Sequence, residues 1–179
     1  DDPADLYANG EWNWDTFADM CVEFTDAEND KYALDGWYYD TALTASSGLP
    51  LISMENGVIT NNISSPELAK AQNMLYDLQL NGVCYPKNEH NWEMRDNTVG
   101  AGIGTGLTLF YIVGLWSIED APSATEVFGD ISAGDVMFVP VPCAADSEAQ
   151  YAPARVHGFC IVEGASNPEG VAAFLDCAR

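Results

Sequence analysis

The chain has 179 residues, enough for one well-buried domain, and 47% of them are hydrophobic, which excludes a disordered protein. Its 28 acidic residues against 6 basic ones give a formal net charge of -22. Because phosphate binding needs lysine and arginine, this charge excludes a nucleic-acid-binding role, and we interpret it chiefly as a source of solubility. No apolar run is long enough to predict a transmembrane helix.

The first part of the chain alternates helix and strand patterns. Residues 13–25 are predicted to form an amphipathic helix capped by Asn13, because apolar side chains recur along it at helical spacing. Residues 32–39 are typical of a short strand that runs into a turn. Small residues at 41–47 then predict a helix that ends at Gly48.

A hairpin and the clearest helix of the chain follow. Residues 53–60 read as a hairpin around the turn dipeptide Asn56-Gly57. The helix after it has Ser65 as its cap, proline at its first position, and its end at Gly82. Its apolar stripe consists of Leu68, Ala71, Leu75 and Leu78.

The second part of the chain continues the alternation. Residues 100–106 carry glycine at every second position, but they lack the lysine of a phosphate loop, so we predict a flexible connector. Strands are predicted at 107–113, 135–139 and 159–162, and helices at 116–125 and from Asn167 onward. Interleaved helices and strands predict an α/β layered fold, with a mixed sheet flanked by helices.

The five cysteines match no zinc-ligand spacing, and their odd number leaves at least one thiol unpaired. They are Cys21, Cys84, Cys143, Cys160 and Cys177. We interpret them as mostly free and buried, with a Cys84–Cys143 disulfide as the open alternative.

Catalytic and metal-binding patterns are weak. His90 and His157 stand in no metal-ligand motif, and no nucleophile, acid and base recur at a known spacing, so we expect no enzymatic activity, no cofactor and no metal. Asp26, Glu28 and Asp30 alternate as in the first half of a calcium loop, but Lys31 stands where that loop needs glycine. We interpret this stretch as a solvated acidic turn.

Aromatic residues near predicted strand ends carry the main functional signal. Trp37 and Tyr38 follow one predicted strand, with Asp40 beside them, and Trp116 follows another. Sugars offer apolar C–H faces and a rim of hydroxyls, so flat aromatic side chains next to carboxylates suit them. The alternative is that these aromatics simply fill the core.

The opening residues 6–17, LYANGEWNWDTF, are similar to a segment of family-1 bacterial extracellular solute-binding proteins, which serve sugar-importing ABC transporters. The resemblance continues in order through Asn56-Gly57, the helix entry at 64–67, Gly114-Leu115-Trp116, the strand 136–142, and residues 157–169. It spans essentially the whole chain. Tryptophans Trp12 and Trp14 of the opening segment are interpreted as packing residues.

The resemblance implies a periplasmic-binding-protein-like (type II) lobe. Residues 1–156 correspond to the second, C-terminal lobe of a two-lobed protein, and residues 157–179 to the strand and helix that return toward the first lobe. It places Trp116 at a sugar-stacking position, Tyr38 at another ligand-facing one, and a hinge-side contact at His157, where the family has glycine. Trp37 and Asp40 join these as neighbouring candidates.

Function and location follow from the same resemblance. It implies a monomeric component of an ABC importer. This component binds a sugar or oligosaccharide, works with permease subunits in the membrane, and does no catalysis. It also implies an extracellular or periplasmic location, with lipid anchoring through a segment outside this chain. Two alternatives stay open: a solute-binding protein for a peptide or polyamine, and a secreted glycoside hydrolase with paired carboxylates.

Overall fold

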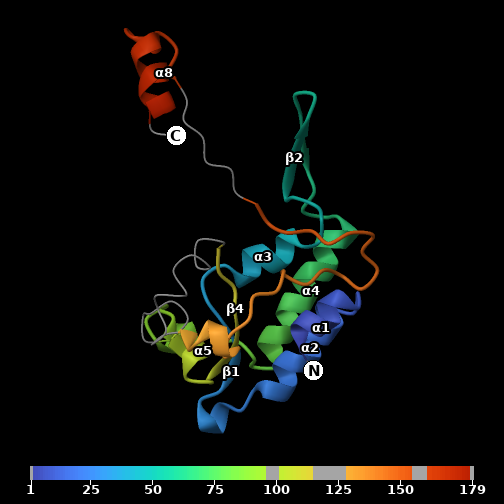
Figure 1. Ribbon diagram of the computed structural model, residues 1–179. Coiled ribbons are helices and arrows are strands. Elements are labelled where there is room, and N and C mark those ends of the chain that lie inside the picture. The colour runs from blue at the N-terminus through green and yellow to red at the C-terminus, as the bar shows by residue number, and fades with distance from the viewer. Residues whose placement is uncertain (1, 96–100, 115–127, 155–160, 178–179) are drawn as a thin grey trace.

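The computed structural model of the protein describes residues 2–95, 101–114, 128–154 and 161–177 (Figure 1). Helices and two small sheets make up a mixed α/β structure, which confirms the predicted fold class. The helices are α1 Pro3–Ala8, α2 Trp14–Phe24, α3 Tyr39–Ala45, α4 Pro66–Leu80, α5 Ala101–Gly104 and α8 Pro168–Cys177. The strands are β1 Tyr32–Asp35, β2 Ile52–Glu55, β3 Val58–Asn61 and β4 Thr108–Tyr111. In the described part of the chain, no helix is long and apolar enough to cross a membrane.

Helix α2 begins where the sequence predicts. The Asn13 side chain accepts from the backbone N–H groups of Asp15 and Thr16, at 2.9 and 3.2 Å, and the Thr16 hydroxyl accepts in return from the Asn13 N–H at 3.1 Å. This reciprocal capping box satisfies donors that the first turn of a helix leaves unpaired. The buried face of α2 consists of Trp14, Phe17 and Cys21.

Strand β1 lies between strand β4 and the segment that contains Val83 and Tyr85. It pairs in parallel with β4, with Tyr32 opposite Thr108 and Leu34 opposite Phe110. On its other edge Leu34 donates to Val83 at 3.0 Å and accepts from the Tyr85 N–H at 2.9 Å. Because both edges are paired, β1 is the buried strand around which the other elements gather.

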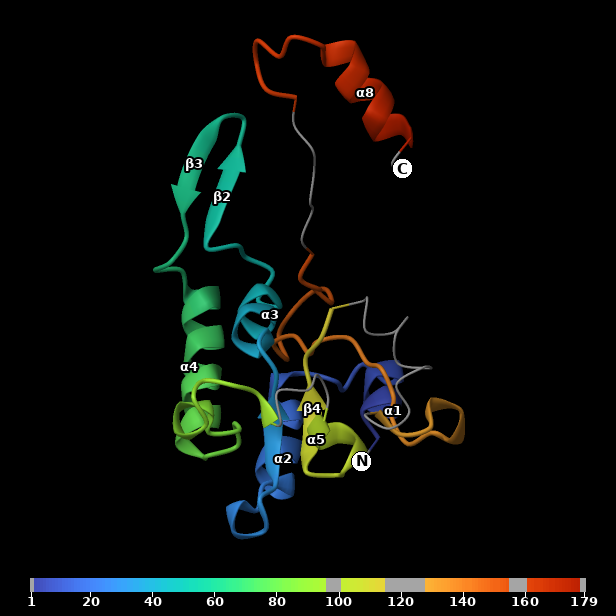
Figure 2. The ribbon, with the colours of Figure 1, turned by 90° about the vertical axis from the view of Figure 1, so that its left-hand side faces the viewer.

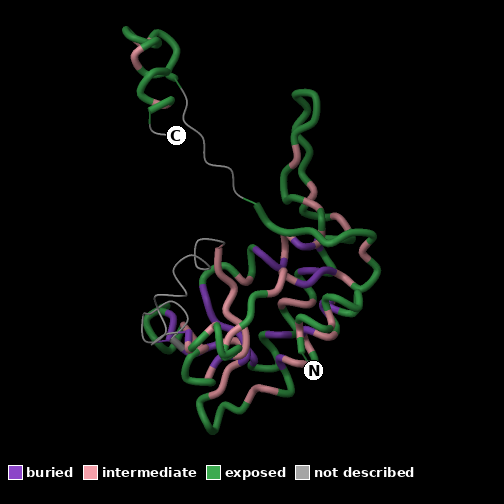
Figure 3. Tube along the Cα trace, in the orientation of Figure 1, coloured by how far each residue is buried: buried purple, intermediate pink, exposed green. Residues whose placement is uncertain are grey.

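The core forms where α2, α3 and α4 pack together with β1 (Figure 3). Trp12, Phe17 and Phe110 meet with ring centroids 5.0–5.9 Å apart, an arrangement that stabilises the contact between the start of α2 and β4. The buried cluster consists of Trp12, Phe17, Cys21, Ala33, Leu34, Leu43, Leu78 and Val83. Trp12 and Trp14 are therefore packing residues, as expected.

The predicted hairpin and the helix after it are confirmed. Strands β2 and β3 pair antiparallel around Asn56 and Gly57, whose φ angles of 51° and 79° are those of a tight two-residue hairpin turn. The hairpin projects from the body beyond α3 (Figure 2). Helix α4 has Ser65 as its cap, with the Ser65 hydroxyl accepting from the Leu68 N–H at 3.3 Å.

The predicted strand at 135–139 is wrong: this segment forms no strand, and it has no strand partner among the described residues. Prolines 140 and 142 have no N–H to donate to a ladder, and their carbonyls are taken by side chains instead. The indole N–H of Trp12 donates to the Pro140 oxygen at 2.7 Å, and that of Trp14 to the Pro142 oxygen at 2.9 Å.

Three other expectations either need correction or concern residues outside the described ranges. Residues 101–104 form the short helix α5 where we expected a connector, and the backbone of Gly102 lies against Thr108 so closely that a Cβ would stand 2.0 Å from the Thr108 hydroxyl. Ile161 and Val162 form no strand, and residues 159–160 lie outside the described residues. The helix expected at 116–125 also lies outside them.

The cysteines in the described part of the chain are free, so the alternative Cys84–Cys143 disulfide is absent there. Cys21 and Cys143 are buried and Cys84 is half-buried, whereas Cys177 is exposed and so departs from the expectation that the cysteines are mostly buried. The Cys143 sulfur accepts from the Tyr151 N–H at 3.0 Å.

Candidate functional site

Three of the five predicted ligand residues lie together where β1 ends and α3 begins. Trp37 and Tyr38 occupy the connection, and Asp40 lies in the first turn of α3. Trp116 and His157 lie outside the described residues, so the structure does not place them.

The local backbone explains why the two aromatics stand at the surface. Gly36 follows the buried strand with a φ of 107°, a conformation that favours glycine, and a Cβ there would stand 3.2 Å from the Ile112 oxygen. The chain therefore leaves the sheet abruptly. Trp37 and Tyr38 come next and are 45% and 43% exposed, although they directly follow fully buried residues. Exposed neighbouring aromatics at a strand end are typical of a ligand platform.

Asp40 faces solvent, and one of its oxygens is already engaged. Its Oδ1 atom accepts from the Thr41 N–H at 2.6 Å and from the Thr41 hydroxyl at 3.2 Å. The structure therefore brings a fixed carboxylate next to the two aromatics, which is what hydroxyl recognition needs.

The structure also brings to this place three residues that the sequence reading missed: Asp35, Tyr39 and Lys87. Lys87 Nζ lies 5.0 Å from the Trp37 ring centroid, 4.8 Å from that of Tyr39 and 3.9 Å from Asp35 Oδ1. The run Val83-Cys84-Tyr85 between Gly82 and Pro86 was the available signal. A short β-prone run there indicates a segment beside the sheet, which carries Lys87 to the end of β1.

Burial changes the pKa values of Cys84, Tyr39 and Lys87 at this end of β1. It raises the pKa of the Cys84 thiol to about 11, against an opposing hydrogen bond with Tyr39. Burial also raises the pKa of the Tyr39 hydroxyl, and the nearby Cys84 adds to that rise. It lowers the pKa of Lys87, whereas the Asp35 carboxylate acts to raise it. The site is thus partly shielded from water, where charged groups interact more strongly.

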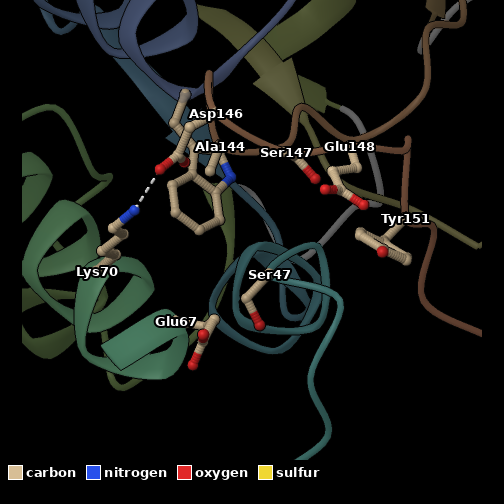
Figure 4. Close-up of a pocket in the computed structure, with 9 residues that line it drawn as sticks. Ser47, Glu67, Lys70, Ala144, Asp146, Ser147, Glu148 and Tyr151 are labelled. Carbon is tan, nitrogen blue, oxygen red and sulfur yellow. Dashed lines mark hydrogen bonds and ion pairs between the residues drawn. The ribbon is translucent and has the colours of Figure 1, made fainter. Parts of the chain in front are cut away.

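A separate pocket of about 280 Å³ lies near the other end of α3 (Figure 4). Ser47 just after α3, the first turns of α4 and the loop 144–151 surround it. Its lining consists of Trp14, Ser47, Glu67, Lys70, Ala144, Asp146, Ser147, Glu148 and Tyr151. Since Trp37 and Tyr38 precede α3 and Ser47 follows it, the pocket and the aromatic pair are at opposite ends of that helix.

The pocket's polar groups mostly serve the fold. Lys70 Nζ pairs with Asp146 Oδ2 at 2.5 Å, and this exposed pair raises the pKa of Lys70 and lowers that of Asp146. The Trp14 indole N–H bonds to Ser46 Oγ at 3.0 Å, leaving its ring to border the pocket. Because these polar groups are already paired within the protein, we rank the pocket below the end of β1 as a ligand site.

The acidic turn at 26–30 uses the carboxylates of Asp26 and Asp30 in internal contacts. Asp26 accepts from the Asn29 side chain at 2.6 Å, which is the main reason that its pKa is lowered. Asp30 Oδ2 accepts from Arg95 at 2.5 Å. No cluster of three or more potential metal ligands occurs among the residues that the structure describes.

Comparison with known proteins gives one match that spans the chain. The family model of the bacterial extracellular solute-binding proteins matches residues 2–179. No curated protein and no solved structure was found to match the chain.

Proposed function

Because this chain belongs to the bacterial extracellular solute-binding proteins, we propose that it is the substrate-binding component of an ABC importer for a sugar or oligosaccharide. Members of this family work outside the cytoplasm and pass a small molecule to a membrane transporter. Binding here rests on aromatic stacking and hydrogen bonds, with no catalytic step. In this proposal the protein acts as a monomer and is held at the cell surface by a lipid anchor.

The observation that carries the sugar assignment is the exposed pair Trp37 and Tyr38 at the end of a buried parallel strand. Each ring can cover one face of a sugar, and Asp40 beside them can accept from hydroxyl groups. Ligands of open α/β sheets lie outside the strand ends, which is where these three residues stand. Trp116 and His157 complete the proposed site by resemblance.

A two-lobed parent protein is part of the same proposal. Residues 1–156 would form the second lobe and residues 157–179 the return toward the first. The exposure of α8 supports this division: none of its described residues is buried, and Phe174 is 68% exposed. The helix also lies apart from the other described elements in two views (Figures 1 and 2). An apolar helix face without a partner is typical of a helix that packs on another domain.

A thermal-shift screen of the complete secreted protein tests the ligand class, with oligosaccharides, amino acids and polyamines as probes. Stabilisation by one class of sugar supports the proposal, because a ligand that binds the folded state raises its stability by mass action. Stabilisation by polyamines or amino acids alone contradicts it.

The variants Trp37→Ala and Tyr38→Ala then test the site with the best sugar from the screen. Losing roughly 60 Å² of apolar contact is worth about 1.5 kcal/mol, so each should weaken binding about tenfold in calorimetry. Tyr76→Ala is the matched control, since Tyr76 is also an exposed tyrosine but lies on α4. Equal affinities of all three variants for the sugar would show that Trp37 and Tyr38 are not part of the binding site.

A further inference from the structure

The end of β1 forms a box for an ammonium group, and the protein fills that box itself. The rings of Trp37 and Tyr39 lie around Lys87 Nζ, with centroids 5.0 and 4.8 Å away. Lys87 donates to the Gly36 carbonyl oxygen, and Asp35 Oδ1 lies 3.9 Å from Nζ. Two aromatic faces, a carbonyl and a carboxylate are the groups that recognise a cation.

The surrounding backbone holds Lys87 in place. Its N–H donates to the Tyr85 oxygen at 2.8 Å, and Tyr85 in turn is bonded to β1 through Leu34 at 2.9 Å. The segment that carries Lys87 is thus fixed to the same strand that carries the box. The Lys87 side chain is only 12% exposed, so water cannot readily take the place of these contacts.

The carboxylate of Asp35 is committed to the same arrangement. Asp35 is 1% exposed, accepts from the Gly36 N–H at 2.7 Å, and accepts from the Arg95 N–H at 3.1 Å. A buried carboxylate of this kind needs a nearby positive charge, and Lys87 is the cation paired with it. Removing Lys87 would leave the box both vacant and negatively charged.

We propose that Lys87 is the positioning residue of the Trp37 platform and that, by filling the box, it excludes cationic ligands from this end of β1. The ammonium supports one side of the Trp37 ring and leaves the exposed part of the ring to the ligand. The ligand class is then an uncharged sugar. The ligand part of this inference rests on the proposed function, whereas the positioning of Trp37 does not.

Replacing the missing ammonium from solution tests the positioning role. Lys87→Ala removes the three outer carbons and Nζ of the side chain, and n-propylammonium has those atoms. The protein would carry 5-fluorotryptophan, with the Trp37 fluorine resonance assigned through Trp37→Phe. We expect Lys87→Ala to shift or broaden the Trp37 resonance, n-propylammonium to restore it at millimolar concentration, and n-propanol to have no effect.

The controls separate positioning from simple loss of stability. Lys87→Arg keeps a cation and should leave the Trp37 resonance near its wild-type position. Lys87→Met keeps only the apolar part of the side chain and should shift or broaden that resonance. If Lys87→Ala does not fold, Lys87→Met gives the same comparison without rescue. A Trp37 resonance that is unchanged in both uncharged variants would overturn the proposal, and so would an equal response of the wild type to n-propylammonium.

Ligand selectivity tests the exclusion role. In thermal-shift titrations with putrescine, we expect no stabilisation of the wild type and at least tenfold tighter binding by Lys87→Ala. Putrescine binding to the wild type that is lost in Trp37→Ala would overturn the exclusion. If no sugar binds the wild type but n-propylammonium still restores the Trp37 resonance, the proposed sugar function fails while the positioning role of Lys87 stands.

Discussion

The indole N–H of Trp12 donates to the carbonyl oxygen of Pro140 at 2.7 Å, across 128 residues of sequence. Two residues later in each segment, the indole N–H of Trp14 reaches the Pro142 oxygen at 2.9 Å. The opening of the chain thus fixes a proline-containing segment that has no strand partner in the part of the chain that the structure describes. The part-buried Pro140 carbonyl and the buried Pro142 carbonyl gain donors in this way.

Replacing Trp14 by phenylalanine should destabilise the protein by about 1–3 kcal/mol, because the buried Pro142 oxygen and Ser46 hydroxyl lose their shared donor. Urea unfolding followed by circular dichroism measures the change. Trp92→Phe is the control: Trp92 is 70% exposed, and its replacement should change the free energy of unfolding by less than about 0.5 kcal/mol. Similar losses in both variants would contradict the role of Trp14.

Helix α4 offers a matched pair of leucines two positions apart. Leu78 is 2% exposed and belongs to the core cluster, whereas Leu80 is 67% exposed. Leu78→Ala should cost about 2–5 kcal/mol in the free energy of unfolding, since it leaves a cavity beside β1, and Leu80→Ala should cost under about 1 kcal/mol. If both substitutions prove equally mild in the same denaturation assay, α4 does not pack as described.

The capping box of α2 is open to a conservative test. Asn13→Ala removes the acceptor for two N–H groups and should lower the free energy of unfolding by about 1 kcal/mol. Asn13→Asp keeps a carboxyl oxygen as acceptor and adds a negative charge at the helix start, so it should retain wild-type stability. Thermal unfolding of the wild type and the two variants in one buffer measures these differences. A loss of stability in Asn13→Asp as large as in Asn13→Ala would contradict the capping role of Asn13.

The Cys84 thiol should react slowly. Burial raises its pKa to about 11, whereas Cys177 is exposed, and alkylation needs the thiolate. At pH 8 we expect iodoacetamide to modify Cys177 at least about tenfold faster than Cys84, as measured by peptide mass spectrometry. Comparable rates at the two cysteines in the folded protein would contradict the burial of Cys84.

The same raised pKa predicts a loss of stability at alkaline pH. The folded protein holds the Cys84 proton more tightly than the unfolded chain, whose thiol has the ordinary pKa of 9.0. Stability from this group is therefore complete below pH 9 and declines as the pH rises toward about 11. Unfolding at pH 8 and pH 10.5 should show this decline, and Cys84→Ala should reduce it.

Local signals predicted helices α2, α4 and α8 and the hairpin well, whereas α1 was not predicted and α5 was expected as a connector. Asn13 and Ser65 cap α2 and α4 as expected, and Asn56-Gly57 forms the hairpin turn. Caps and tight turns are decided by a few adjacent residues, so the sequence contains all that they require. The predicted start of α3 was less accurate. Tyr38 precedes this helix without a side-chain cap, so the sequence contains no capping residue to mark its start.

The main errors come from segments whose partners are distant. Residues 135–139 have a β-prone composition, yet their neighbours Pro140 and Pro142 meet indole groups rather than a strand. Residues 101–104 form a helix, and Gly102 lies so close to Thr108 that a larger side chain would not fit there. Contacts of this kind depend on how the chain folds back on itself, which no local pattern records.

The sequence by itself determined the α/β class, the family, and the choice of Trp37, Tyr38 and Asp40 as candidates, because periodicity, caps and motif order are properties of neighbouring residues. Only the tertiary structure decided that those aromatics stand exposed beside a buried strand, and that Lys87 fills the space between Trp37 and Tyr39. The physical reason is that an ammonium group binds where two aromatic rings and a carboxylate lie close together. These groups lie close together only after β1 has paired with the segment that carries the lysine.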